Sequence, residues 1–213
     1  MKVYVVVVGF LVSLLSSLLL QAQTLPEVSA LQQRWAEVNY LLDGKSQVQA
    51  FSTLIEDARK VTQAHEGDAQ AWIWSGIIRS SYAGVKGGLG ALSAAKAAKA
   101  DFEKAMSLDA DAMEGSAYTS LGVLYLNVPS WPVGFGDPQK GVELLEKGLV
   151  LSPNGIDSNY FYAEYLLKEH SYPEASLYLQ RAMNAPLRDG RGLADQGRRA
   201  EIERMLQQIN AAH

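Results

Sequence analysis

The polar side chains of this 213-residue chain match no recognised pattern of catalytic or metal-binding residues. His65, His170 and His213 are widely separated, whereas zinc ligands recur at short, regular spacings. The chain has no cysteine, which excludes disulfides, zinc–thiolate sites and a catalytic thiol. No serine lies in the Gly-x-Ser-x-Gly context of a nucleophile elbow. We therefore expect a protein that is not an enzyme and that needs no metal and no cofactor.

Residues 84–90 are rich in glycine and resemble a phosphate-binding loop only superficially. They lack the Gly-x4-Gly-Lys-Ser/Thr order of such loops, and no strand pattern precedes them. Glycines at these positions are more typical of the end of one helix and the start of the next. We expect a sharp reversal between two helices here.

Five arginines form a basic cluster near the C-terminus: Arg188, Arg191, Arg198, Arg199 and Arg204. Arg199 and Glu203 lie four residues apart, a spacing typical of a solvated helix face. A site for an anion or a carboxylate is the alternative interpretation of this cluster.

Residues 128–137 are the most unusual passage of the sequence. Pro129 and Pro132 restrict the backbone, and Trp131 and Phe135 place large apolar rings in a segment that we expect at the surface. The rings either anchor the loop on its own helix pair or contact a ligand or partner.

These residues must be positioned by a repeat whose period lies in the mid-thirties. The clearest unit is Tyr118-x2-Leu121-Gly122-x2-Tyr125, followed by Gly141-x3-Leu145-x2-Gly148. Bulky residues next to small ones at helix crossings are typical of tetratricopeptide repeats. We predict an all-α fold: a tetratricopeptide-like helical-hairpin solenoid of about four helix pairs plus a C-terminal capping helix. The single predicted domain covers residues 26–213, with pairs at about 26–65, 69–109, 111–153 and 156–187 and a cap at 193–211.

Local signals support these boundaries. Asp111-x-x-Glu114 matches a capping box at the start of the third pair, and Asp137-Pro138 matches an N-cap followed by a proline in the first turn. The two crossing positions are 12 residues apart in the last pair but 22 and 19 apart in the second and third. Those two pairs therefore contain insertions of ten and seven residues, and such insertions often lie on the binding face of a solenoid.

Matching positions to the repeat places a set of polar and aromatic side chains on the concave surface. The candidates are Tyr40, Trp74, Thr119, Asn127, Tyr160 and Glu164, to which the loop adds Trp131 and Phe135. Such a groove suits a small ligand or an extended peptide. Ordinary packing between repeats is the alternative for each residue taken singly.

Residues 1–22 have the pattern of a secretory signal, with Lys2 followed by an apolar run and a small residue at Ala22. We expect cleavage and a periplasmic protein. The alternative is an uncleaved anchor in the inner membrane, because the run approaches spanning length. The formal net charge of −4 argues against a nucleic-acid partner.

Residues 70–185 resemble the TRAP transporter-associated T component (TatT) family of periplasmic tetratricopeptide-like proteins. The resemblance lies in Tyr118 to Tyr125, Pro129 with Gly134-Phe135-Gly136-Asp137, Lys140 to Leu151, and Tyr162-Ala163-Glu164-Tyr165. It implies work with a solute-binding subunit of a tripartite transporter, and by analogy ring assembly and a ligand cleft. Members are often lipoproteins, whereas this chain has no cysteine to lipidate.

Two functions remain open from the sequence. In the first, the protein is a transport accessory that docks a periplasmic solute-binding protein and holds a small apolar ligand. In the second, it is an adaptor for envelope assembly that binds peptide segments of its partners. A homo-oligomer is compatible with both.

Overall fold

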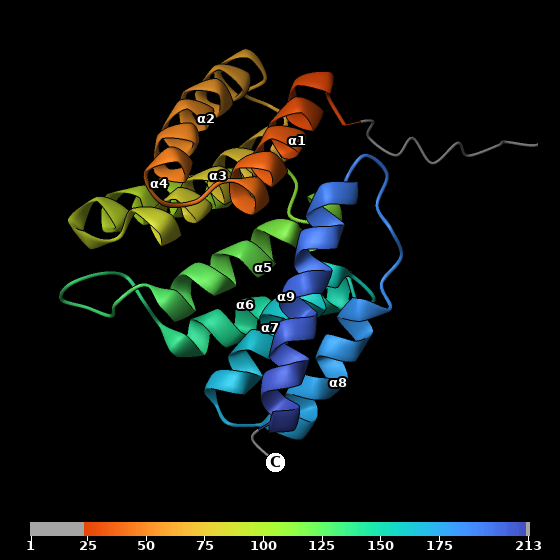
Figure 1. Cartoon of the computed structure of the whole chain (residues 1–213). Helices are drawn as coiled ribbons and strands as arrows, with labels where there is room; N and C mark the ends of the chain where they lie inside the picture. Colours follow the sequence, from red (N-terminus) through yellow and green to blue (C-terminus); the bar gives the residue numbers. More distant parts are fainter. Residues whose placement is uncertain (1–23, 212–213) are drawn as a thin grey trace, which may run out of the picture.

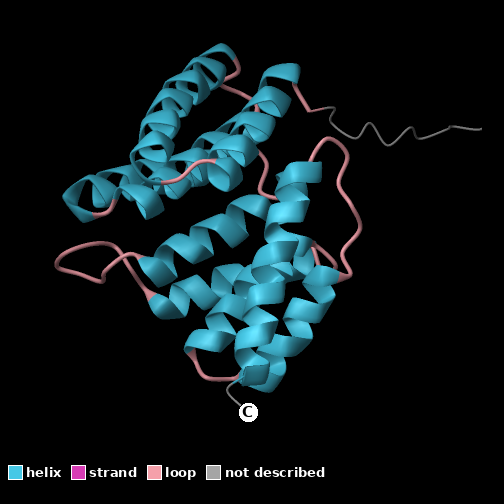
Figure 2. Cartoon of the chain, in the orientation of Figure 1, coloured by secondary structure: helices cyan, strands magenta, loops and turns pink. Residues whose placement is uncertain are grey.

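The computed structural model describes residues 24–211, and every regular element assigned in that range is a helix (Figures 1 and 2). The predicted signal segment, residues 1–22, lies outside the described residues. The described helices are α1 (Pro26–Leu41), α2 (Gly44–Ala64), α3 (Ala69–Lys86), α4 (Gly88–Leu108), α5 (Ala112–Asn127), α6 (Pro138–Leu151), α7 (Ile156–Lys168), α8 (Tyr172–Met183) and α9 (Gly192–Ala211). The first eight pack as successive hairpins, α1–α2 to α7–α8. The all-α, helical-hairpin architecture is therefore as predicted.

Local chemistry sets several of the helix ends. The Asp137 carboxylate accepts a hydrogen bond from the backbone N–H of Lys140 at 3.1 Å, and Pro138 lies in the first turn of α6. Gly87 and Gly88 both have a φ of +63° where the chain reverses between α3 and α4. Only glycine adopts that backbone conformation without strain, so the glycine-rich stretch is a helix junction as expected.

The capping box predicted at the start of α5 does not form. The side chain of Asp111 makes no capping hydrogen bond, and Glu114 accepts one from the Ser152 hydroxyl at 2.6 Å instead. Met113, Glu114 and Gly115 have φ values of +50°, +54° and +72°, so regular helix begins only after them. A capping box needs helical backbone at its third position, which Glu114 lacks.

Small residues lie where the two helices of a pair cross. A Cβ atom added at Gly122 in α5 would lie 2.9 Å from the carbonyl oxygen of Gly141 in α6 and 3.1 Å from the Leu145 side chain. Ala163 and Ala175, the crossing residues of the last pair, are fully buried. Short side chains at these positions let the helix axes approach closely.

The two predicted insertions take different forms. The first is accommodated within the helices of its pair, which are long: α3 has 18 residues and α4 has 21. The second forms the loop 128–137 between α5 and α6, which projects to the left in Figure 1, away from α9.

Helix α9 does more than cap the last pair. Its Ile202 and Ile209 side chains are buried against α7 and α8, as a cap requires. The helix also extends back to α1, where Ala194 joins the same apolar cluster as Val28 and Trp35. Helix α9 contacts α1, α7 and α8, and Figure 1 shows it beside α8. The helix thus covers the inner side of the solenoid and links its first and last pairs.

Candidate ligand-binding cavity

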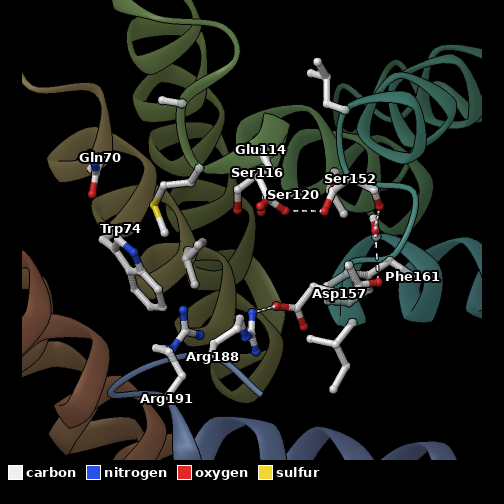
Figure 3. Close-up of a pocket in the computed structure, with 18 of the residues that line it drawn as sticks. Gln70, Trp74, Glu114, Ser116, Ser120, Ser152, Asp157, Phe161, Arg188 and Arg191 are labelled. Carbon is white, nitrogen blue, oxygen red and sulfur yellow. Dashed lines mark hydrogen bonds and ion pairs between the residues drawn. The ribbon is translucent and has the colours of Figure 1, made fainter. Parts of the chain in front are cut away.

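A cavity of about 1450 Å³ lies between the first helices of the pairs and α9. Its walls come from α1, α3, α5 and α7, from the connections between successive pairs, and from residues 185–201. Pockets for small molecules usually measure about 300–1000 Å³, so this one has room for a ligand of that class or larger. Figure 3 shows side chains from several of these elements converging on the same space.

One wall of the cavity is aromatic and apolar. Trp74 in α3 is 1% exposed, and its ring centroid lies 5.7 Å from that of Trp35 in an edge-to-face arrangement. The Nε1–H of Trp35 donates to the Ser81 hydroxyl at 2.8 Å, whereas the Nε1–H of Trp74 has no hydrogen-bond partner within residues 24–211. Ile77 and Met113 extend the apolar surface beside Trp74. This wall favours an apolar or aromatic group in the ligand.

The neighbouring wall carries hydroxyl groups. Ser116 and Ser120 lie one helical turn apart on α5, and Figure 3 shows them at the edge of the same space as Trp74. Ser80 in α3 also lines the cavity, and its buried hydroxyl has no hydrogen-bond partner in the part of the chain that the structure describes. Polar groups of this kind orient a ligand within an otherwise apolar pocket.

A network of ion pairs borders the cavity on the side of α9. The Asp157 carboxylate, at the start of α7, accepts from Arg188 Nη1 at 2.7 Å and from Arg198 Nε at 2.9 Å. Burial by itself raises the pKa of Asp157, but the attraction of Arg198 and Arg188 outweighs it and holds that pKa well below its usual range. Arg188 also donates to Asp195 in α9. These contacts attach the linker between α8 and α9 to α7 and to α9.

Arg191 differs from the other arginines of the cavity. Its guanidinium lies 4.7 Å from the ring centroid of Trp74, and its buried Nε–H has no hydrogen-bond partner among the described residues. Burial and the nearby charge of Arg188 lower the pKa of Arg191 to about 10. The side chain is therefore still a cation at neutral pH, and it forms no ion pair with any carboxylate in the described part of the chain.

Some of the predicted binding residues lie at this cavity and some do not. Trp74 and Thr119 line it. Tyr40 packs instead against Gly197 of α9, and Tyr160 lies in the core with the Arg198 guanidinium 4.1 Å from its ring centroid. Glu164 is partly exposed on α7, outside the cavity lining. Helix α9 occupies the part of the concave surface where Tyr40 and Tyr160 were expected to meet a ligand.

The remaining predicted residues lie near the loop 128–137, away from the cavity. Asn127 is exposed and accepts a hydrogen bond from Lys168 Nζ at 2.7 Å. Phe135 packs edge-to-face on Tyr125 with ring centroids 5.5 Å apart. Trp131 is 85% exposed. Phe135 therefore anchors the loop on its own helix pair, whereas contact of the exposed Trp131 with a ligand or partner stays a prediction.

Sequence reasoning did not select the arginines and serines that the structure brings to the cavity. The basic cluster near the C-terminus has two interpretations from the sequence: a solvated helix face, or a site for an anion. Arg188 and Arg198 are largely removed from solvent in ion pairs, so the solvated-face interpretation does not fit them. Ser116 and Ser120 carried a weaker signal, their four-residue spacing in a mostly apolar helix.

Within residues 24–211, no helix is both long and apolar enough to cross a bilayer. In the same range, no group of three or more side chains is arranged to hold a metal ion. In comparisons with known proteins, no family model matches this chain, and no curated protein matches it significantly.

Proposed function

We propose that this protein is a non-enzymatic binding protein of the bacterial cell envelope that holds a small, partly apolar solute in the cavity beneath α9. The observation that carries the proposal is the cavity itself, which all four helix pairs and α9 build together. A helical stack that acted only as a spacer would need neither a helix covering its inner side nor an internal cavity of this size. The periplasmic location and the role as a transport accessory rest on the N-terminal segment and on the tetratricopeptide-like resemblance to the TatT family.

The charges at the cavity support binding rather than catalysis. A general base needs a pKa near the working pH and a free lone pair directed at its substrate. The Asp157 carboxylate lacks such a pKa, because two arginines hold its pKa well below the usual range. The Ser152 hydroxyl donates to the Glu114 carboxylate at 2.6 Å, and Glu201 is bound by Arg198 at 2.6 Å. No histidine lines the cavity in the described part of the chain.

A protein partner, such as a solute-binding subunit, is proposed to dock at the loop 128–137. Trp131 and Val133 are 85% and 63% exposed, and exposed tryptophan is a frequent centre of binding energy at interfaces. The loop is held at its base by Phe135, so these two apolar side chains are presented at little entropic cost.

An adaptor that binds peptide segments is the second candidate. The size of the cavity favours it, since about 1450 Å³ exceeds the usual range for a small-molecule site. An extended peptide of several residues would fill such a space more completely than most metabolites.

Purification from envelope extract followed by native mass spectrometry distinguishes the two candidates. A bound molecule of a few hundred daltons, released on denaturation, supports the solute-binding proposal. The matched control is Ser120→Trp, which places a bulky indole in the cavity and should reduce the added mass while leaving helicity unchanged. Recovery of peptides in place of a small molecule would favour the adaptor, and recovery of neither would contradict both.

A further inference from the structure

We propose that the solute is an organic anion, a carboxylate or a similar acidic group on an apolar body, and that Arg191 binds its anionic head. This inference rests on the proposed function and specifies the class of ligand. Arg191 lines the cavity and stacks on Trp74, and both side chains face the open space in Figure 3.

The first argument concerns charge. Asp157 and Asp195 are each bound by Arg188, and Glu201 accepts from Arg198 Nη1 at 2.6 Å. Each carboxylate of this network is thus bound by Arg188 or Arg198, and Arg191 is the cation without a direct ion pair among the described residues that line the cavity. A partly buried cation attracts an anion strongly, because little solvent screens it.

The second argument concerns hydrogen bonding. Arg191 Nε–H and Trp74 Nε1–H both lack an acceptor in the described chain, although Trp74 is 1% exposed. Buried donors normally have a partner, so two unpaired donors beside one cavity indicate a ligand that supplies the acceptor. Both groups can only donate, so they suit a ligand group that only accepts. A carboxylate has that property, and arginine binds it in a matched planar geometry.

The third argument concerns size. A simple inorganic anion would leave most of the 1450 Å³ empty. The walls beyond Trp74 include Ile77, Met113 and Phe161, which offer apolar contact but no positive charge. An anionic head with an apolar or aromatic body therefore fits the cavity better than a polyanion does.

Two fluorescent dyes test the proposal on the full-length protein. Anilinonaphthalene sulfonate and phenylnaphthylamine share the same ring system, but only the first carries an anionic group. We expect the sulfonate dye to bind wild-type protein more tightly than phenylnaphthylamine, and octanoate to displace it better than octanamide does. Arg191→Gln should weaken binding of the sulfonate dye about 10- to 100-fold, the range for a lost charge-assisted hydrogen bond, and change binding of phenylnaphthylamine less than about threefold.

Arg181→Gln is the matched control. Arg181 also stacks on an aromatic ring, with 5.0 Å to the Tyr178 centroid, but it lies on α8 outside the cavity. This variant should bind both dyes as wild type does.

The outcomes separate this inference from the proposed function. Equal binding of both dyes by wild type and by Arg191→Gln would overturn the anion site while the cavity still binds apolar solutes. Failure of wild type to bind either dye would contradict the proposed function itself. Should Arg191→Gln fold poorly, Arg191→Lys decides instead, because it keeps the charge. Preferential binding of the sulfonate dye by that variant supports the inference, and an equal loss for both dyes overturns it.

Discussion

The contact between Arg188 and Asp195 offers a direct test of how α9 closes the cavity. The Asp195 side chain is 1% exposed and accepts from the backbone N–H of Arg188 at 2.9 Å, from its Nε at 2.8 Å and from its Nη2 at 2.5 Å. Asp195→Ala removes all three hydrogen bonds at once. The linker between α8 and α9 then loses its main attachment to the closing helix.

The expected loss of stability follows from the burial of the two partners. Removing one member of a buried ion pair typically costs about 3–5 kcal/mol. Arg188 is 32% exposed and keeps Asp157 as a second partner, so solvent and that carboxylate compensate part of the cost. We therefore expect Asp195→Ala to lower the free energy of unfolding by about 2–3 kcal/mol. For a domain of this size, that corresponds to a decrease in Tm of about 4–12 °C.

Thermal unfolding followed by circular dichroism measures this effect. Asp189→Ala is the control, because Asp189 lies in the same linker but is exposed, and its loss should change stability by less than about 0.5 kcal/mol. A double-mutant cycle with Arg188→Ala should give a coupling energy of at least about 1 kcal/mol. A coupling energy near zero would refute the reasoning, since the two side chains would then stabilise the fold independently of each other.

Three further predictions concern other parts of the molecule. The pKa of Asp157 is depressed in the folded state, so this residue contributes stability above about pH 4 that is lost as the pH falls. The Tm of Asp157→Asn should therefore fall less than the Tm of wild type below pH 4. Gly122→Ala should destabilise by about 1–3 kcal/mol in a melt because its Cβ atom meets the backbone of α6, whereas Gly84→Ala, with open space around it, should stabilise by about 0.5–1 kcal/mol. Trp131→Ala should leave the Tm within about 1 °C of wild type while weakening partner capture, whereas Phe135→Ala should destabilise by about 1–2 kcal/mol.

For each of these three predictions, one result would contradict the structural feature on which the prediction rests. Parallel acid profiles for Asp157→Asn and wild type would mean that the two arginines do not perturb the carboxylate. Equal effects of the Gly122 and Gly84 substitutions would reject the close crossing of α5 and α6. A large loss of stability in Trp131→Ala would show that the ring is packed rather than exposed, and unchanged partner capture would remove the loop from the proposed interface.

The hairpins could be predicted from the sequence because their determinants are local. Apolar spacing, the Asp137-Pro138 start of α6 and the Gly87-Gly88 junction each act within a few residues. Small residues at Gly122 and Gly141 marked a helix crossing, because only short side chains let two helix axes approach so closely. The fold class followed from repeating these local signals along the chain.

The cavity could not be predicted in the same way, because it depends on contacts between residues far apart in the chain. Nothing in the pattern of α9 distinguishes a helix that caps the last pair from one that also returns to α1, since both bury Ile202 and Ile209. The contacts of Ala194 and Gly197 with side chains of α1 distinguish the two arrangements, and they form only once the linker has brought α9 back to the first pair. The sequence alone therefore determined the helices and their pairing, through local periodicity and turn chemistry. Only tertiary structure decided which inner side chains α9 covers, because long-range charge pairing and burial have no local signature.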